Sequence, residues 1–226
     1  MSYLPFFVGL LPSFVWFYFF IREDENHPEP KILIFYAFLA GIVSTFFVLG
    51  PQMFLGDILP SFGVGVYSPA ALAVLGAIEE LFKFFAVYLV ISWRRDFDEP
   101  IDAMVYMIIA GLGFAAVENI ASVAKGIIPF GGGPNGVEIA SLRFVGATLL
   151  HSLASALVGY YWGLAMRDKA KLGWLIAEGI GVATLLHAIF NSLIIKYGPE
   201  TFVATLLLVA AAFFVLNDFE KLKSAD

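Results

Sequence analysis

The sequence predicts an all-α protein, a polytopic bundle of about seven transmembrane helices that forms a single integral membrane domain over residues 1–226. Of the 226 residues, 60% are hydrophobic and only 14% are charged, whereas a soluble domain is about half apolar and about a quarter charged. The apolar residues also gather in runs of about 20, the length of helix that crosses the hydrocarbon core of a bilayer. We therefore expect a multi-pass protein of the cell membrane, surrounded by the lipid bilayer.

Seven apolar runs are separated by segments rich in charge, Pro or Gly, which are typical of loops. The clearest breaks are the charged stretch from Arg22 to Lys31 and the glycine-rich residues 130–136. Ser68 followed by Pro69 is typical of a helix start, because the missing N–H of proline is not needed in the first turn. The predicted spans are Leu4–Ile21, Ile32–Leu49, Pro69–Trp93, Ile101–Ala124, Val137–Met166, Leu172–Ile195 and Pro199–Leu216.

The basic residues are divided unevenly between the two sets of loops. Nine Lys and Arg residues fall in loops on one side of the predicted bundle, and only Lys125 and Lys196 fall on the other. Cytoplasmic loops carry an excess of Lys and Arg. The N-terminus is therefore predicted to lie outside the cell and the C-terminus in the cytoplasm.

Charge and cysteine content exclude several classes of function. The formal net charge is −6 and no basic cluster is present, which argues against nucleic acid as a partner, since binding to phosphates needs concentrated Lys and Arg. The chain has no Cys. Disulfides, thiolate metal sites and a cysteine nucleophile are therefore excluded.

A few ionisable residues lie inside the predicted spans, where a charge at the helix centre costs about 2.5 to 3.5 kcal/mol and is a candidate for function. Four of them, one from each of four helices, are Glu80, Glu118, His151 and His187. Counted at about 1.5 Å per residue, these four lie about 20–27 Å from the cytoplasmic ends of their helices. We expect them to share one layer in the outer half of the membrane. Arg143, near the outer end of its span, is expected to snorkel to the interface. The ionisable residues in this layer are Glu79, Glu80, Lys83, Glu118, His151 and His187.

The spacing of these residues predicts which of them face one another. Lys83 lies one helical turn from both Glu79 and Glu80, so it can compensate the charge of one glutamate while the other points elsewhere. Ser155 and Asn191 each follow a histidine by one turn. These two side chains are therefore expected to lie on the same helix faces as the histidines.

Elimination leaves a site built from Glu and His. The chain has no HExxH motif, and Asp102, the second residue of its span, is the one Asp within the predicted spans, which removes a zincin site on one helix and an aspartyl dyad. A serine route through Ser152 or Ser155 stays open, although the G-x-S-x-G elbow is missing. Two roles fit the remaining groups. A glutamate can activate water, or Glu118, His151 and His187 can bind Zn²⁺ or another divalent metal with Glu79 or Glu80 as the base.

Two motifs resemble those of a known family. The glutamates and lysine of Ala77–Lys83, in the sequence AIEELFK, are similar to the EExxK motif of the PrsW-like intramembrane proteases, and Phe114 with Glu118 is similar to their FxxxE motif. The helices that carry His151 and His187 resemble the later His motifs. This family is related to the CAAX prenyl endopeptidases and the bacteriocin-immunity proteins. The resemblance covers about residues 70–195, and we expect the catalytic core at about 69–196.

The resemblance implies cleavage of a membrane-anchored protein, such as an anti-sigma factor, near the outer face. The residues expected to be catalytic are Glu79, Glu80, Glu118, His151 and His187, with Lys83, Asn119, Ser155 and Asn191 in support.

Two other functions fit the polar layer. Chains of Glu and His inside a membrane also serve as proton relays, so a proton- or cation-coupled transporter is one alternative. The other is a non-catalytic protein of the immunity type, in which the polar groups only join helices.

Overall fold

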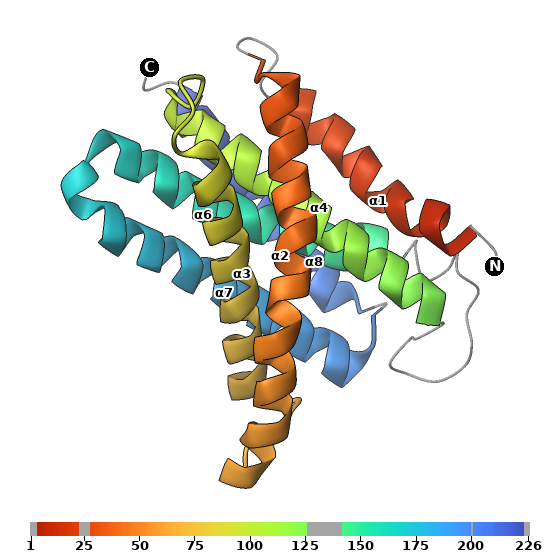
Figure 1. Ribbon diagram of the computed structural model, residues 1–226. Coiled ribbons are helices and arrows are strands. Elements are labelled where there is room, and N and C mark those ends of the chain that lie inside the picture. Colours follow the sequence, from red (N-terminus) through yellow and green to blue (C-terminus); the bar gives the residue numbers. More distant parts are fainter. Residues whose placement is uncertain (1–3, 23–27, 126–141, 200, 224–226) are drawn as a thin grey trace.

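The computed structural model describes residues 4–22, 28–125, 142–199 and 201–223, and these residues form helices and connecting turns without strands (Figure 1). This confirms the all-α class and the helical membrane bundle. The α-helices are α1 (Leu4–Ile21), α2 (Lys31–Ile58), α3 (Pro69–Ile91), α4 (Pro100–Lys125), α6 (Leu149–Arg167), α7 (Leu172–Tyr197) and α8 (Phe202–Lys223).

Five helical segments in the described part of the chain are long and apolar enough to cross a membrane, and they contain α2, α4, α6, α7 and α8. α3 is long enough, but every 18-residue window of it contains Glu79, Glu80 and Lys83. The apolar part of α1 is shorter, Phe7–Ile21. The fold is thus that of a multi-pass membrane protein, while the count of seven spans and the orientation of the termini stay predictions.

The main difference from the predicted helix bounds is in α2. A span ending at Leu49 is expected because Gly50 and Pro51 follow, but α2 continues through Pro51 to Ile58. Proline within a membrane helix is tolerated where neighbouring groups satisfy the backbone. The start of the predicted span at Val137 lies outside the described residues, and a π-helix, η3 (Phe144–Thr148), leads into α6.

α4 is the central helix and packs against α1, α2 and α6. Of the most apolar window in α4, 94% is buried. Small residues allow this close packing, as is usual between membrane helices. A Cβ atom at Gly111 would lie 2.6 Å from the carbonyl oxygen of His151. The backbone of α4 therefore passes directly beside the α6 turn that carries this histidine.

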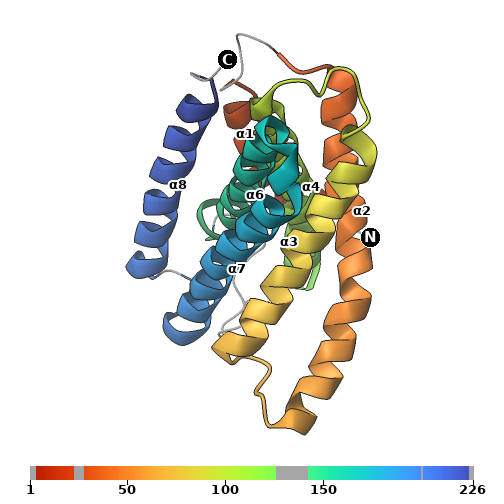
Figure 2. The same ribbon diagram turned by 90° about the vertical axis from the view of Figure 1, so that its left-hand side faces the viewer.

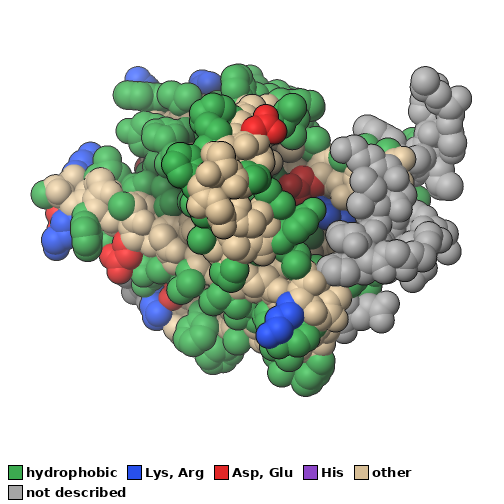
Figure 3. Space-filling model, turned by 90° about the horizontal axis from the view of Figure 1, so that it is seen from below, with side chains coloured by type: hydrophobic (Ala, Val, Ile, Leu, Met, Phe, Trp, Pro, Cys, Tyr) green, Lys and Arg blue, Asp and Glu red, His purple; other side chains and the backbone are tan. Residues whose placement is uncertain are grey.

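Much of the outer surface is apolar. Exposed aromatic side chains include Phe46, Phe47 and Phe213, which are 61–72% exposed. Seen from below, hydrophobic side chains cover much of the surface, and charged side chains lie among them, several of them together at one side (Figure 3). Both ribbon views show the hairpin of α2 and α3 extending beyond the other helices at one end (Figure 2). This surface is suited to lipid.

Candidate active site

Four helices bring the predicted site residues together. Glu79 and Glu80 come from α3, Glu118 from α4, His151 from α6 and His187 from α7. All five are joined by side-chain contacts of 3.5 Å or less, directly or through Lys83. The helices are thus neighbours, as the shared layer predicts. The catalytic roles of these residues stay a prediction.

Lys83 compensates Glu80 and not Glu79. Its Nζ donates to Glu80 Oε1 at 2.6 Å, and both side chains are fully buried. The Lys83 ammonium also lies 4.9 Å from the centre of the Phe114 ring, a favourable position for a buried cation. The EExxK motif therefore separates its two glutamates, since one is in an ion pair along α3 and the other is directed elsewhere.

Glu79 is directed toward α2 and α7. Its Oε1 accepts a hydrogen bond from Gln52 Nε2 at 2.8 Å. Its Oε2 lies 3.5 Å from His187 Nε2 and has no hydrogen-bond partner, although it is buried. The Glu79 side chain is 10% exposed, compared with 0% for Glu80. Glu79 is therefore the more accessible of the paired acids, with one carboxylate oxygen available.

The partners of His151 define its tautomer. Nδ1 lies 3.3 Å from Lys83 Nζ, and Nε2 lies 3.0 Å from Glu118 Oε2. An ammonium can only donate and a carboxylate can only accept. In a neutral imidazole, Nδ1 therefore accepts from Lys83 and the Nε2–H donates to Glu118. The carboxylate of Glu118 orients the ring, which presents Nδ1 toward the interior of the cluster.

His187 has a similar arrangement with the ring nitrogens exchanged. Nδ1 lies 3.2 Å from Glu80 Oε1, to which it donates, and Nε2 faces Glu79 Oε2. Both imidazoles are thus oriented by a carboxylate, and each directs its second nitrogen inward. The two rings are perpendicular, with centroids 5.1 Å apart. A carboxylate behind an imidazole is the usual support of a histidine that binds a metal or moves a proton.

Arg143 points into this network instead of toward the membrane interface, which corrects the snorkelling expected from sequence. Its Nη2 donates to Glu118 Oε2 at 3.0 Å and its Nε donates to Asn119 Oδ1. Asn119 Nδ2 in turn donates to Thr148 Oγ1 at 2.9 Å. The Arg143 and Glu118 side chains are only partly buried, 22% and 32% exposed. Arg143 thus holds Glu118, and through it His151.

The other supporting residues differ in their contacts. Ser155 is fully buried where α6 meets Gly111, and its Oγ has no hydrogen-bond partner. Asn191 is half-buried one turn after His187 on α7. In the described part of the chain no hydrogen bond joins either of these side chains to the cluster. Their support of the site therefore stays a prediction.

The cluster contains three carboxylates and two permanently basic side chains. Lys83 forms an ion pair with Glu80, and Arg143 forms one with Glu118. In the described part of the chain, the side chains that contact the Glu79 carboxylate are Gln52 and His187.

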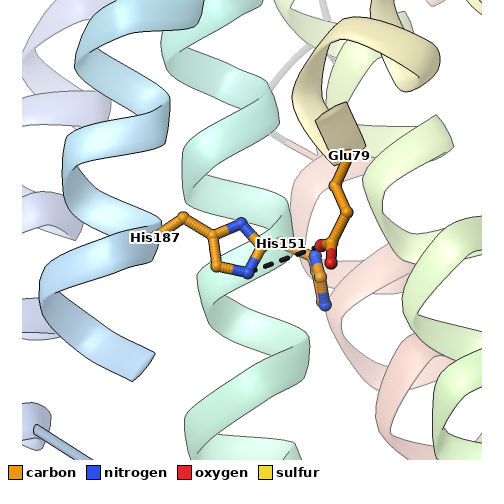
Figure 4. Close-up of side chains that lie close together, drawn as sticks. All are labelled: Glu79, His151 and His187. Atoms are coloured by element: carbon orange, nitrogen blue, oxygen red, sulfur yellow. Dashed lines mark ion pairs between the residues drawn. The ribbon is translucent and has the colours of Figure 1, made fainter. Parts of the chain in front are cut away.

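Three of the side chains have the chemistry of a metal site. The three residues are Glu79, His151 and His187, and all of them are buried (Figure 4). Each offers one ligand atom, and these three atoms lie within 4.8 Å of one another. The set predicted from sequence is Glu118, His151 and His187, so the structure brings Glu79 and not Glu118 next to the two histidines. The reason is that Glu118 lies behind His151 and is held by Arg143. The unpartnered Oε2 of Glu79 and two oriented imidazoles fit Zn²⁺. Lys83 occupies the lone pair of His151 Nδ1, so an ion would have to replace that donor.

The contacts of Gln52, Thr148 and Arg143 in the polar network are not predicted from sequence. Gln52 is uncharged and follows a Gly-Pro pair that predicts a helix end. Thr148 occurs in an apolar segment, where threonine is common between helices. The available signal for Arg143 is its position eight residues before His151 on the same predicted span, slightly more than two helical turns.

Comparison with known proteins identifies similar chains. A family model described as PrsW family intramembrane metalloprotease matches residues 29–217. The chain is 32% identical over 189 residues to Protease PrsW of Geobacillus kaustophilus, covering 83% of this chain and 78% of the relative. It is 27% identical over 221 residues to Protease PrsW of Bacillus subtilis, covering 96% and 95% of the two chains. No solved structure matches.

Proposed function

Because the chain belongs to the PrsW family of intramembrane metalloproteases, we propose that Glu79, His151 and His187 are the reaction centre of this protease. The observation that supports this assignment is that all three are buried, with ligand atoms within 4.8 Å of one another. Of the paired glutamates, Glu79 is the less buried and is not in an ion pair with Lys83, and its unpartnered Oε2 faces His187 Nε2 at 3.5 Å. This arrangement favours Glu79 over Glu80 as the group that accepts a proton.

In the proposed reaction, Glu79 Oε2 takes a proton from a water molecule. The hydroxide oxygen forms a bond to the carbonyl carbon of the substrate peptide. In this proposal His187 is protonated on both nitrogens, so that its Nδ1–H donates to Glu80 and its Nε2–H donates to the developing oxyanion. The C–N bond then breaks, and the proton held by Glu79 passes to the leaving amine. Glu79 is thus base and then acid, while the low-dielectric surroundings strengthen the stabilisation of the oxyanion.

The remaining charged residues have positioning roles in this proposal. Glu80 fixes His187 through Nδ1, and Glu118 fixes His151 through Nε2. Lys83 and Arg143 hold these two carboxylates in turn. Each imidazole therefore keeps one orientation, which pre-organised catalysis requires.

In the alternative form of this proposal, a divalent ion such as Zn²⁺ would be held by Glu79, His151 and His187, and Glu79 would then be a ligand of the ion instead of the base. The ion would supply Lewis acidity toward the carbonyl oxygen and lower the pKa of a water molecule. We expect one ion per chain in the purified protein and its loss in the variant His187→Ala, measured by elemental analysis. A protein that retains full cleavage with no ion bound would contradict the metal.

The proposed substrate is a protein anchored by one membrane span and cleaved near the outer face, as the depth of the polar layer predicts. Such a protein can reach a buried site by moving sideways in the bilayer. An anti-sigma factor is a substrate of this kind.

The experiment uses purified full-length protein in liposomes with a set of peptides, each an apolar segment of about 20 residues followed by a polar extension. Released fragments are identified by mass spectrometry. We expect cleavage by the parent and a fall of at least about 100-fold in Glu79→Gln, since general base catalysis contributes about 10²–10⁴-fold. The matched control Glu178→Gln removes an exposed carboxylate of α7 and should cleave as the parent does. Unchanged cleavage by Glu79→Gln would refute the assignment.

A further inference from the structure

α2 continues beyond Pro51 and thereby brings Gln52 to Glu79. The residues after the proline remain helical as far as Ile58. Met53 and Phe54 face outward and are 71% and 64% exposed, whereas Gln52 is half-buried and turned toward α3. A helix that ended at Leu49 would not carry the amide of Gln52 to the site. This turn of α2 therefore directs one polar side chain inward, next to two apolar ones that are exposed on the outer surface.

The Gln52 amide occupies one oxygen of Glu79 and leaves the other available. Nε2 donates to Glu79 Oε1 at 2.8 Å. Glu79 Oε2, which has no hydrogen-bond partner, then faces Nε2 of His187 at 3.5 Å. A carboxylate without the first contact is free to rotate about its last side-chain bond, because such terminal torsions are broad. The hydrogen bond thus fixes the orientation of the carboxylate, with one oxygen on Gln52 and the other directed at the imidazole.

The partner of Glu79 is also of a different kind from the partners of the other acids. Glu80 is held by the ammonium of Lys83 and Glu118 by the guanidinium of Arg143. Gln52 is a neutral donor, so it orients the carboxylate without adding a positive charge beside it. A group that must gain and lose a proton in each turnover is better served by such a donor than by a fixed cation.

We propose that Gln52 is a positioning residue for the reaction, which orients Glu79 from α2, outside the segment that carries the EExxK, FxxxE and His motifs. This inference rests on the proposed role of Glu79. It implies that α2 is part of the active site and not only a neighbouring membrane span.

Two substitutions test this role in the liposome assay. Gln52→Leu removes the donor at nearly constant volume, and Gln52→Asn keeps an amide on a side chain one methylene shorter, which withdraws it from Oε1. Both should lower kcat by about 10–100-fold, the usual effect of losing a group that orients a reacting residue, with KM changed by less than about threefold. The matched control Met53→Ala alters the next residue of the same turn, which is exposed on the outer surface, and should leave kcat unchanged.

A second measurement does not depend on cleavage. The infrared carboxyl bands of Glu79 are assigned as those lost in Glu79→Gln, and they should shift in Gln52→Leu and Gln52→Asn but not in Met53→Ala. Bands that stay in place, or a kcat equal to that of the parent in Gln52→Leu, would overturn the inference. If the parent cleaves no peptide of the set, the proposed function fails, while the infrared bands still decide whether Gln52 orients Glu79.

Discussion

Lys83 is the residue for which the structure predicts the largest effect on stability. Its ammonium lies 2.6 Å from Glu80 Oε1, and neither side chain is exposed. The substitution Lys83→Met leaves the Glu80 carboxylate buried without its cation, and removing one partner of a buried pair costs about 3–5 kcal/mol. His187 Nδ1, 3.2 Å from the same oxygen, can compensate part of the charge. We therefore expect the lower end of this range, about 3 kcal/mol.

The double variant Lys83→Met with Glu80→Gln separates the charge from the packing. It removes both charges, so the free energy of unfolding should recover most of the loss, because replacing a whole buried pair is often nearly neutral. A matched control exists on the surface. Lys171 and Asp168 have the same i, i+3 spacing at 2.8 Å, but their side chains are 67% and 45% exposed. Lys171→Met should have no resolvable effect, since exposed ion pairs contribute little.

The assay is equilibrium unfolding of the purified proteins in detergent micelles, followed by circular dichroism and extrapolated to zero denaturant. Lys83→Met should unfold well before the parent and the Lys171→Met control. The reasoning is refuted if Lys83→Met is within about 0.5 kcal/mol of the parent, the range of ordinary surface substitutions. It is also refuted if the double variant is less stable than the single one.

Two further predictions concern packing and the outer part of the polar network. Gly41→Ala places a Cβ 1.9 Å from a backbone oxygen of α4 and should cost about 1–3 kcal/mol or more in the same unfolding assay. Gly50→Ala on the same helix meets no atom within 4 Å and should be neutral or stabilising, so equal effects would contradict the packing. Arg143→Gln frees Glu118 and should lower kcat/KM in the peptide assay by about 10-fold or more. The control Arg95→Gln, in an exposed turn, should be silent, and an equal response of both variants would indicate a general effect of charge.

Much of the polar layer can be predicted from sequence because ionisable residues are rare inside apolar membrane spans and are therefore easy to identify. Few charged residues occur inside apolar runs, and the helical rise alone predicts that acids and imidazoles from four helices have a common depth. The structure agrees, since side-chain contacts join Glu79, Glu80, Glu118, His151 and His187. The spacing of Lys83 also predicts that only one glutamate is compensated, but it does not say which, because both lie one turn away.

The amino-acid sequence is enough to predict the membrane location, the helices and the family, since these depend on composition, on apolar periodicity and on local motifs. The side-chain partners within the site depend on the tertiary structure. Which glutamate faces Lys83, that Glu118 lies behind His151, and that Arg143 points inward all depend on how helices far apart in the chain are rotated against one another. Gln52 is the clearest case. Its local signal predicts a helix end, and only the packing of α2 against α3 places it on Glu79.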